Sequence, residues 1–270
     1  MTNNKNILSN LLRNKIESKL KSTILNIHIM YNSFIMNIKS NIPNSNDLDL
    51  QLLWNNKLVP DQNDVDNIYE LMCATINILS ETKINYHLIA GSALGQARNG
   101  GLIPWDDDVD FGIHSKDADK LWENKDYFIE RGYKITKADI GFKLGTGNVI
   151  DDVVTNVDGE DMVIGPNKPF TGINQDIFLF NENGNSDGIK VMRYTSERAR
   201  NTWPKEVIPI YGWYNPKEGD FGGFTVNTLP RDELNWYLTK SFGNNWNTHD
   251  GNGNFLNDKN CARHTSKKNL

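Results

Sequence analysis

Four aspartates fall within five consecutive positions of the chain, as Asp106, Asp107, Asp108 and Asp110. The triplet Ile-Pro-Trp precedes them and Phe-Gly-Ile follows, so we expect the run in a strand and not in a solvated loop. On a strand alternate residues share a face, which would put Asp107 opposite the other three. Like charges packed this densely are costly unless a cation or the solvent neutralises them. An acidic surface strand is the plain alternative, and a metal site is the interpretation that we favour.

A strand that ends in a Gly-Ser turn precedes the acidic run. Residues 85–90 are expected to form the strand, Gly91 and Ser92 the turn, and a short helix is expected to follow through Arg98. The N–H groups at the start of such a helix, together with a hydroxyl, can bind a phosphate. The sequence therefore predicts an anion site next to the aspartates.

A further aspartate opens an apolar run. Asp176 begins Asp-Ile-Phe-Leu-Phe in a strand expected at 172–180, and a charge in so apolar a strand needs a partner. Asp108 and Asp110 could hold Mg²⁺ through oxygen ligands, and Asp176 would then supply a third carboxylate that takes the proton from an attacking hydroxyl. Lys143, between Phe and Leu in another expected strand, could contact a donor phosphate as a point charge; an edge or surface lysine explains it equally well.

Three segments together resemble the LicD family, which also includes fukutin and fukutin-related protein. They are Gly91-Ser-Ala-Leu-Gly-Gln-Ala-Arg98, Ile103-Pro-Trp-Asp-Asp-Asp-Val-Asp110 and Asp176-Ile-Phe, and the second is highly specific. The resemblance covers about residues 65–250, with a serine where the family usually has threonine in the first segment. The stretch 114–118 lacks the arginine and the aromatic residue that the family often places there, which puts the donor or acceptor contacts in question and not the metal site.

The resemblance implies an α+β, nucleotidyltransferase-like fold, in which a small mixed β-sheet is flanked by helices. It also implies a phosphotransferase that moves phosphocholine or an alditol phosphate from a CDP-linked donor onto a glycan acceptor, with Mg²⁺ or Mn²⁺ as cofactor. The predicted metal ligands, which would also carry the chemistry, are Asp108, Asp110 and Asp176. The residues predicted to face the donor phosphates are Gly91, Ser92 and Arg98. The residues beside this ligand set, one of which could orient a ligand, are Asp106, Asp107 and Trp105.

Charge and cysteine content exclude several classes of protein. A net charge of −5 and a pI of about 5.6 argue against a protein that holds nucleic acid by its phosphates. Cys73 and Cys261 lie far apart without a C-x-x-C motif, which excludes a disulfide scaffold and a cysteine-built zinc site.

We find no signal peptide, no membrane-spanning stretch and no N-glycosylation sequon, so a cytoplasmic location is expected. Peripheral contact with a membrane through residues 24–38 stays open.

Three regions are expected along the chain: an N-terminal helical arm and linker (1–60), a catalytic domain (61–250) and a flexible Asn-rich tail (251–270). Within the catalytic domain we expect helices at 64–82, 115–131 and 231–242, a β-hairpin or meander at 133–150, and a turn after the strand 172–180.

Rival interpretations of the same residues remain. One is a glycosyltransferase whose D-x-D motif holds Mn²⁺, another is a nucleotidyl transferase that releases pyrophosphate, and a third is an inactive binding module with the same fold. Trp203, Trp213 and Tyr214 could line a sugar or choline pocket, although core packing explains them nearly as well. His87 is expected in the core or at its rim.

Overall fold

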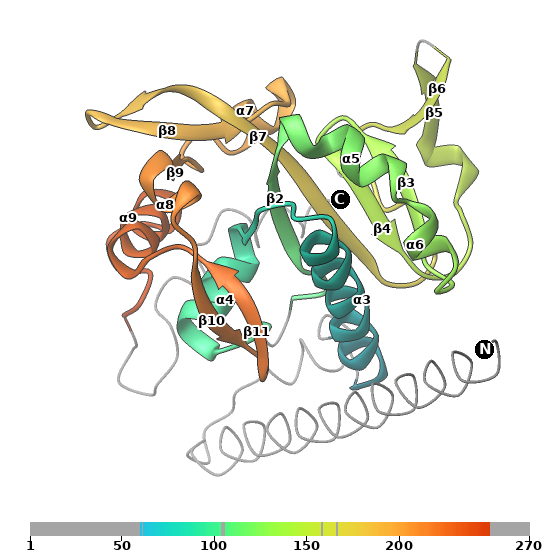
Figure 1. The fold of residues 1–270 in the computed structure, drawn as a ribbon, viewed down its shortest axis with the longest axis horizontal. Coiled ribbons are helices and arrows are strands. Elements are labelled where there is room, and N and C mark those ends of the chain that lie inside the picture. The colour runs from blue at the N-terminus through green and yellow to red at the C-terminus, as the bar shows by residue number, and fades with distance from the viewer. Residues whose placement is uncertain (1–59, 61, 104–105, 158, 166, 249–270) are drawn as a thin grey trace, which may run out of the picture. The chain divides into compact units, whose positions relative to one another are not determined.

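The computed structural model describes residues 60, 62–103, 106–157, 159–165 and 167–248 (Figure 1). The predicted N-terminal arm, apart from Pro60, and the predicted tail lie outside the described residues, as does Trp105. No helix among the described residues is long and apolar enough to cross a membrane.

Seven α-helices and eleven strands build the described part of the chain. The helices are α3 (Gln62–Glu81), α4 (Ala90–Asn99), α5 (Ala118–Glu123), α6 (Asp126–Ile129), α7 (Glu197–Thr202), α8 (Ile210–Tyr214) and α9 (Arg231–Phe242). The strands are β1 (Tyr86–Leu88), β2 (Asp110–His114), β3 (Lys134–Ala138), β4 (Gly141–Gly145), β5 (Val154–Val157), β6 (Glu160–Val163), β7 (Asn174–Ser186), β8 (Ile189–Tyr194), β9 (Ile208–Pro209), β10 (Lys217–Phe221) and β11 (Phe224–Thr228).

Nine of these strands form one mixed sheet, in the order β1-β2-β7-β4-β3-β6-β5, and β8 joins β7 to β9. The pairs β2–β7 and β3–β6 are parallel and the other pairs are antiparallel. Strands β10 and β11 form a separate hairpin. This mixed sheet with helices packed against it confirms the predicted α+β class.

The central strand β7 divides its residues between two faces of the sheet. Gln175 points to the face covered by α3, because its Nε2 donates to Thr75 Oγ1 at 2.7 Å. The next residue, Asp176, points to the opposite face, as do Phe178 and Phe180 farther along the strand. Phe178 and Phe180 belong to the main hydrophobic core, which is formed with residues of α4, α7, α8 and α9. Asp176 therefore lies on the core side of the sheet.

Two differences from the expected elements have local causes. The helix expected at 115–131 is broken into a 3₁₀ turn (Ser115–Asp117), α5 and α6, because the Asn124 side chain donates to Lys120 O at 2.8 Å and ends α5 there. The strand expected to stop at residue 180 continues to Ser186. The turn falls instead at Asp187-Gly188, both with positive φ, a pair that favours a two-residue hairpin loop.

Candidate active site

Three charged residues lie side by side across three adjacent strands. Asp176 of β7 is paired with Asp110 of the parallel neighbour β2 and with Lys143 of the antiparallel neighbour β4. Residues that are paired across neighbouring strands point to the same face of a sheet. We call Asp110, Asp176 and Lys143 the charged row, and it lies at the end of the sheet where β2 begins.

Lys143 and Asp176 form the strongest contact within the charged row. The Lys143 ammonium donates to both carboxylate oxygens of Asp176, at 2.7 and 2.8 Å. The lysine side chain is only 3% exposed and that of the aspartate 19% exposed. A buried ammonium needs such a partner, because leaving water without one costs several kcal/mol. Lys143 is therefore not a surface lysine, and its positive charge is held on the face that carries both aspartates.

The predicted Gly-Ser turn is tied directly to this row. The expected strand is shorter than predicted, because β1 ends at Leu88 and α4 begins at Ala90, which has a φ of 55°. Gly91 and Ser92 therefore lie in the first turn of α4. Ser92 Oγ accepts a hydrogen bond of 2.8 Å from the backbone N–H of Asp110. A Cβ at position 91 would lie 2.7 Å from Asp106 Oδ2, so a larger residue at Gly91 would force the Asp106 carboxylate to shift. The start of α4 is thus fixed against the acidic run, and a phosphate contact for Gly91 and Ser92 stays a prediction.

The expected strand over the acidic run is wrong in its first half. Strand β2 begins only at Asp110, and residues 106–109 are irregular, with Asp106 N–H bonded to Ile103 O at 2.8 Å. Aspartate is disfavoured in strands, and here its side chains gather instead of alternating. Oxygens of Asp106, Asp107 and Asp108 lie within 4.8 Å of one another. Asp107 therefore does not point away from its neighbours.

The ligand chemistry of this cluster fits a hard divalent cation. Carboxylate oxygens are what Mg²⁺ and Mn²⁺ prefer, and three oxygens within 4.8 Å could share one ion. Asp106 is buried, and Asp107 is half-exposed and forms an ion pair with Lys168. Asp108 belongs both to this cluster and to the predicted ligand set with Asp110 and Asp176. Which set binds the metal stays a prediction.

Arg198 was not singled out from the sequence, because no motif surrounds it. Its guanidinium donates to both oxygens of Asp139, at 2.6 and 2.9 Å, and its side chain is 32% exposed. The pKa of Arg198 is raised mainly by these hydrogen bonds; burial lowers it, and the charges of Asp139 and Asp176 raise it further. Arg198, which belongs to α7, therefore lies within electrostatic reach of Asp176 in the charged row.

Arg98 faces a different part of the molecule from the one expected. It lies in the last turn of α4, six residues after Ser92, and its Nε donates to Trp246 O at 2.5 Å. The contact joins α4 to the segment that follows α9. A contact of Arg98 with the donor stays a prediction.

The remaining aromatic candidates are mostly core residues. Trp213 is buried, and Trp203 packs edge-on against Phe178. Tyr214 is exposed and donates to Glu182. His87 is fully buried with its Nε2 2.9 Å from Trp213 O, and burial lowers its pKa to about 4.

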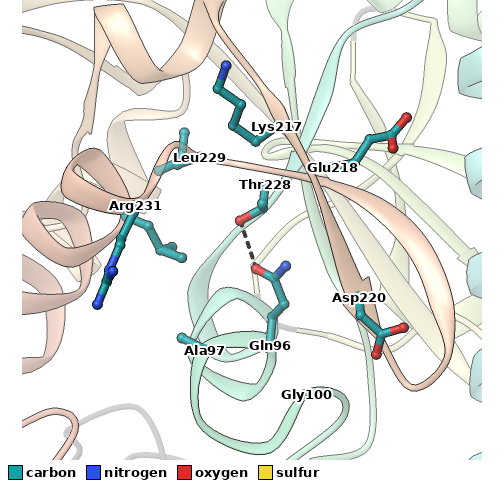
Figure 2. A pocket seen from close by; sticks show the side chains of 10 residues that line it. Gln96, Ala97, Gly100, Lys217, Glu218, Asp220, Thr228, Leu229 and Arg231 are labelled. Atoms are coloured by element: carbon teal, nitrogen blue, oxygen red, sulfur yellow. Dashed lines mark hydrogen bonds between the residues drawn. The ribbon is translucent and has the colours of Figure 1, made fainter.

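A groove of about 500 Å³ lies apart from the charged row (Figure 2). It runs between the C-terminal half of α4, the β10–β11 hairpin and the start of α9, and Thr228 donates to Gln96 Oε1 across it at 2.8 Å. The residues that line it include both basic and acidic side chains, such as Lys217 and Glu218. Neither the carboxylates of the acidic run nor Lys143 line it.

Known proteins share parts of this chain. An uncharacterized protein of Rickettsia prowazekii (strain Madrid E), RP689, is 36% identical over 70 residues, which are 26% of each chain. The human ribitol 5-phosphate transferase FKRP is 48% identical over 43 residues, 16% of this chain and 9% of that protein. The matches thus span about a quarter or less of these relatives' length. The structure of ANT(2″)-Ia in complex with adenylyl-2″-tobramycin aligns over 62% of this chain and 71% of that one, with 14% identity and a TM-score of 0.30.

A family model also matches the sequence. The model described as LicD/FKTN/FKRP, nucleotidyltransferase domain, matches residues 83–228, more than half of the chain. The matched region contains the Gly-Ser turn, the acidic run and the whole charged row. The chain therefore belongs to the LicD/FKTN/FKRP nucleotidyltransferase-domain family.

Proposed function

We propose that this protein is a metal-dependent phosphotransferase, which moves phosphocholine or an alditol phosphate from a CDP-linked donor onto a glycan acceptor. The observation that carries the proposal is the charged row. Asp110 and Asp176 are level on neighbouring strands, and the start of α4 is bound to the same point through Ser92. Carboxylates and a helix start are thus held at one end of the sheet, where a phosphate and a hydroxyl could meet.

Asp108, Asp110 and Asp176 are the residues that we propose to hold the divalent ion. When bound, that ion would supply positive charge against the phosphate oxygens of the donor. Asp176 would also accept the proton of the acceptor hydroxyl, which attacks the β-phosphorus while CMP leaves. Its carboxylate is fixed for this role by the two hydrogen bonds from Lys143.

The cations around the row are the proposed donor contacts. Lys143 is buried beside Asp176, and Arg198 is oriented by Asp139 with a third of its side chain exposed. A guanidinium held in this way can bind a phosphate with little further loss of side-chain entropy. The Ala90 N–H donates to Tyr237 Oη, so the N–H groups of Gly91 and Ser92 are those that we propose to favour an anion at the start of α4.

Family membership supports a transferase of this general kind. The segment shared with ribitol 5-phosphate transferase makes an alditol phosphate the first donor group to test. The family match lies inside the proposed catalytic domain, residues 61–250.

The test is a donor screen with the full chain. CDP-ribitol, CDP-glycerol, CDP-choline and nucleotide-sugars are incubated with Mg²⁺ or Mn²⁺ and candidate glycans, and the released nucleotide is identified. Metal-dependent release of CMP with a phosphorylated glycan supports the proposal. A nucleoside triphosphate is included as a further donor, because only its attack at the α-phosphorus releases pyrophosphate, which would indicate a nucleotidyl transferase. A nucleoside diphosphate released from a nucleotide-sugar would indicate a glycosyltransferase, and donor binding without turnover would indicate an inactive module.

A further inference from the structure

Ala90, the residue that turns β1 into α4, has an unfavourable backbone conformation. Its φ of 55° lies in the left-handed region, which is unfavourable for a residue other than glycine. The preceding residue, Ile89, offers no side-chain cap to the helix. Such a conformation persists only where the surroundings hold it in place.

A buried tyrosine from the far end of the chain supplies that hold. The Ala90 N–H donates to Tyr237 Oη at 2.7 Å, and the same hydroxyl donates to Glu206 Oε1 at 2.5 Å. Tyr237 is fully buried and Glu206 almost so. Tyr237 therefore donates one hydrogen bond to Glu206 and uses an oxygen lone pair to accept the other from Ala90.

The turn is therefore clamped from two sides. On one side Ser92 Oγ binds the N–H of Asp110, at the start of β2. On the other side Tyr237, from α9, binds Ala90 two residues earlier. Between the two bonds lies Gly91, whose lack of a side chain lets Asp106 approach.

We propose that Tyr237 is a positioning residue for the reaction, which fixes the orientation of Gly91 and Ser92 toward the charged row, and that Glu206 orients its hydroxyl. The catalytic role of Tyr237 rests on the proposed function, because it requires that the start of α4 binds the donor. The claim that Tyr237 holds the backbone at Ala90 is independent of the proposed function. Neither Tyr237 nor Glu206 has to touch the substrate.

The sharpest variant is Tyr237→Phe, because it keeps the ring and removes both hydrogen bonds at once. The matched control is Tyr86→Phe. Tyr86 Oη likewise accepts a backbone N–H, that of Asn227 at 3.2 Å, but from the first residue of β1, four positions before Ala90. A rescue variant adds Ala90→Gly to Tyr237→Phe, since glycine adopts a positive φ without strain.

Two readouts separate the local claim from the catalytic one. The first is amide hydrogen exchange of residues 89–94 in the full chain, which we expect to be roughly 10- to 100-fold faster in Tyr237→Phe than in Tyr86→Phe. The second is CMP release, where we expect kcat to fall by roughly tenfold or more with a smaller change in the donor KM. Adding Ala90→Gly should restore part of both.

The outcomes are distinct. Equal exchange at residues 89–94 in Tyr237→Phe and Tyr86→Phe would overturn the proposal, whatever the donor proves to be. Faster exchange with wild-type kcat would also overturn the positioning role. If the wild type released no CMP from any donor while exchange still rose in Tyr237→Phe, the clamp on the turn would be supported and the proposed function would have failed.

Discussion

The carboxylate of Asp176 accepts two hydrogen bonds from the buried ammonium of Lys143, at 2.7 and 2.8 Å. An ion pair at this depth is weak evidence for stability, because a well-packed apolar pair would serve the core as well. Its position argues for function instead, since Asp110 lies level with Asp176 on the other side. The pair keeps a cation and a carboxylate on the face where we expect the donor.

Replacing Lys143 with methionine keeps most of the side-chain volume and removes the charge. We expect the free energy of unfolding to fall by about 3 kcal/mol, because Asp176 loses its buried partner. In the double variant Lys143→Met/Asp176→Asn the loss should be smaller than the sum of the two single losses. Urea unfolding of the wild type, the two single variants and the double variant measures this coupling. Strictly additive losses in the free energy of unfolding would contradict the ion pair.

Replacing Arg198 with glutamine should weaken donor binding more than turnover. We expect the donor KM to rise by roughly tenfold, as for the loss of one charge-assisted contact, with a smaller change in kcat. Arg193→Gln is the matched control, because Arg193 binds only backbone oxygens of Asn183 and Asn185 in the contacts that we describe. Equal KM values in the two variants would remove Arg198 from the donor site.

Stability should depend on pH through His87. Burial lowers its folded-state pKa to about 4, below the usual 6.5, so the unfolded chain binds the proton more readily. The stabilisation is therefore complete above pH 6.5 and is lost as the pH falls toward 4. We expect His87 to contribute a decrease of about 2 kcal/mol in the free energy of unfolding between pH 7 and pH 5. A His87→Gln variant with the wild-type pH dependence would show that another group is responsible.

Asp108 belongs to both candidate ligand sets, so it should matter for metal binding in either case. We expect Asp108→Asn to weaken Mn²⁺ binding by roughly tenfold or more, because the ion loses a charged oxygen ligand. Asp107→Asn should weaken it less, since Asp107 already pairs with Lys168. Titration calorimetry measures both, with Asp187→Asn as the surface control. A larger loss for Asp107 than for Asp108 would favour a site centred on residues 106–107.

The sequence predicted the parts of this site that have a local pattern. The Gly-Ser turn, the acidic run and the aspartate in an apolar strand each stand out within a few residues, and they led to the family and to the sheet that brings them together. The apolar residues that flank the acidic run predict a continuous strand there, whereas β2 begins only at Asp110. In the structure the clustered charges of Asp106 to Asp108 keep that segment out of the ladder.

Contacts between distant segments could not be predicted in the same way. Arg198 is bound to Asp139, and Tyr237 reaches Ala90 across 147 positions, and neither residue carries a local signal of its role. The hairpin turn is a different case. Asp187-Gly188 is a recognisable loop pair, but the Asn-rich stretch before it carries a turn signal of its own, so the sequence pattern does not decide between them.

Turnover by Asp176→Asn is the most direct test of the charged row as the active site. The substitution keeps the shape of the side chain and removes one charge, and Asp187→Asn serves as the control for a surface aspartate. CMP release is measured at saturating donor and metal, with unfolding curves to confirm that each variant is folded. If the charged row is the active site, kcat should fall at least 100-fold in Asp176→Asn and hardly change in Asp187→Asn. A folded Asp176→Asn enzyme that kept wild-type turnover would contradict it.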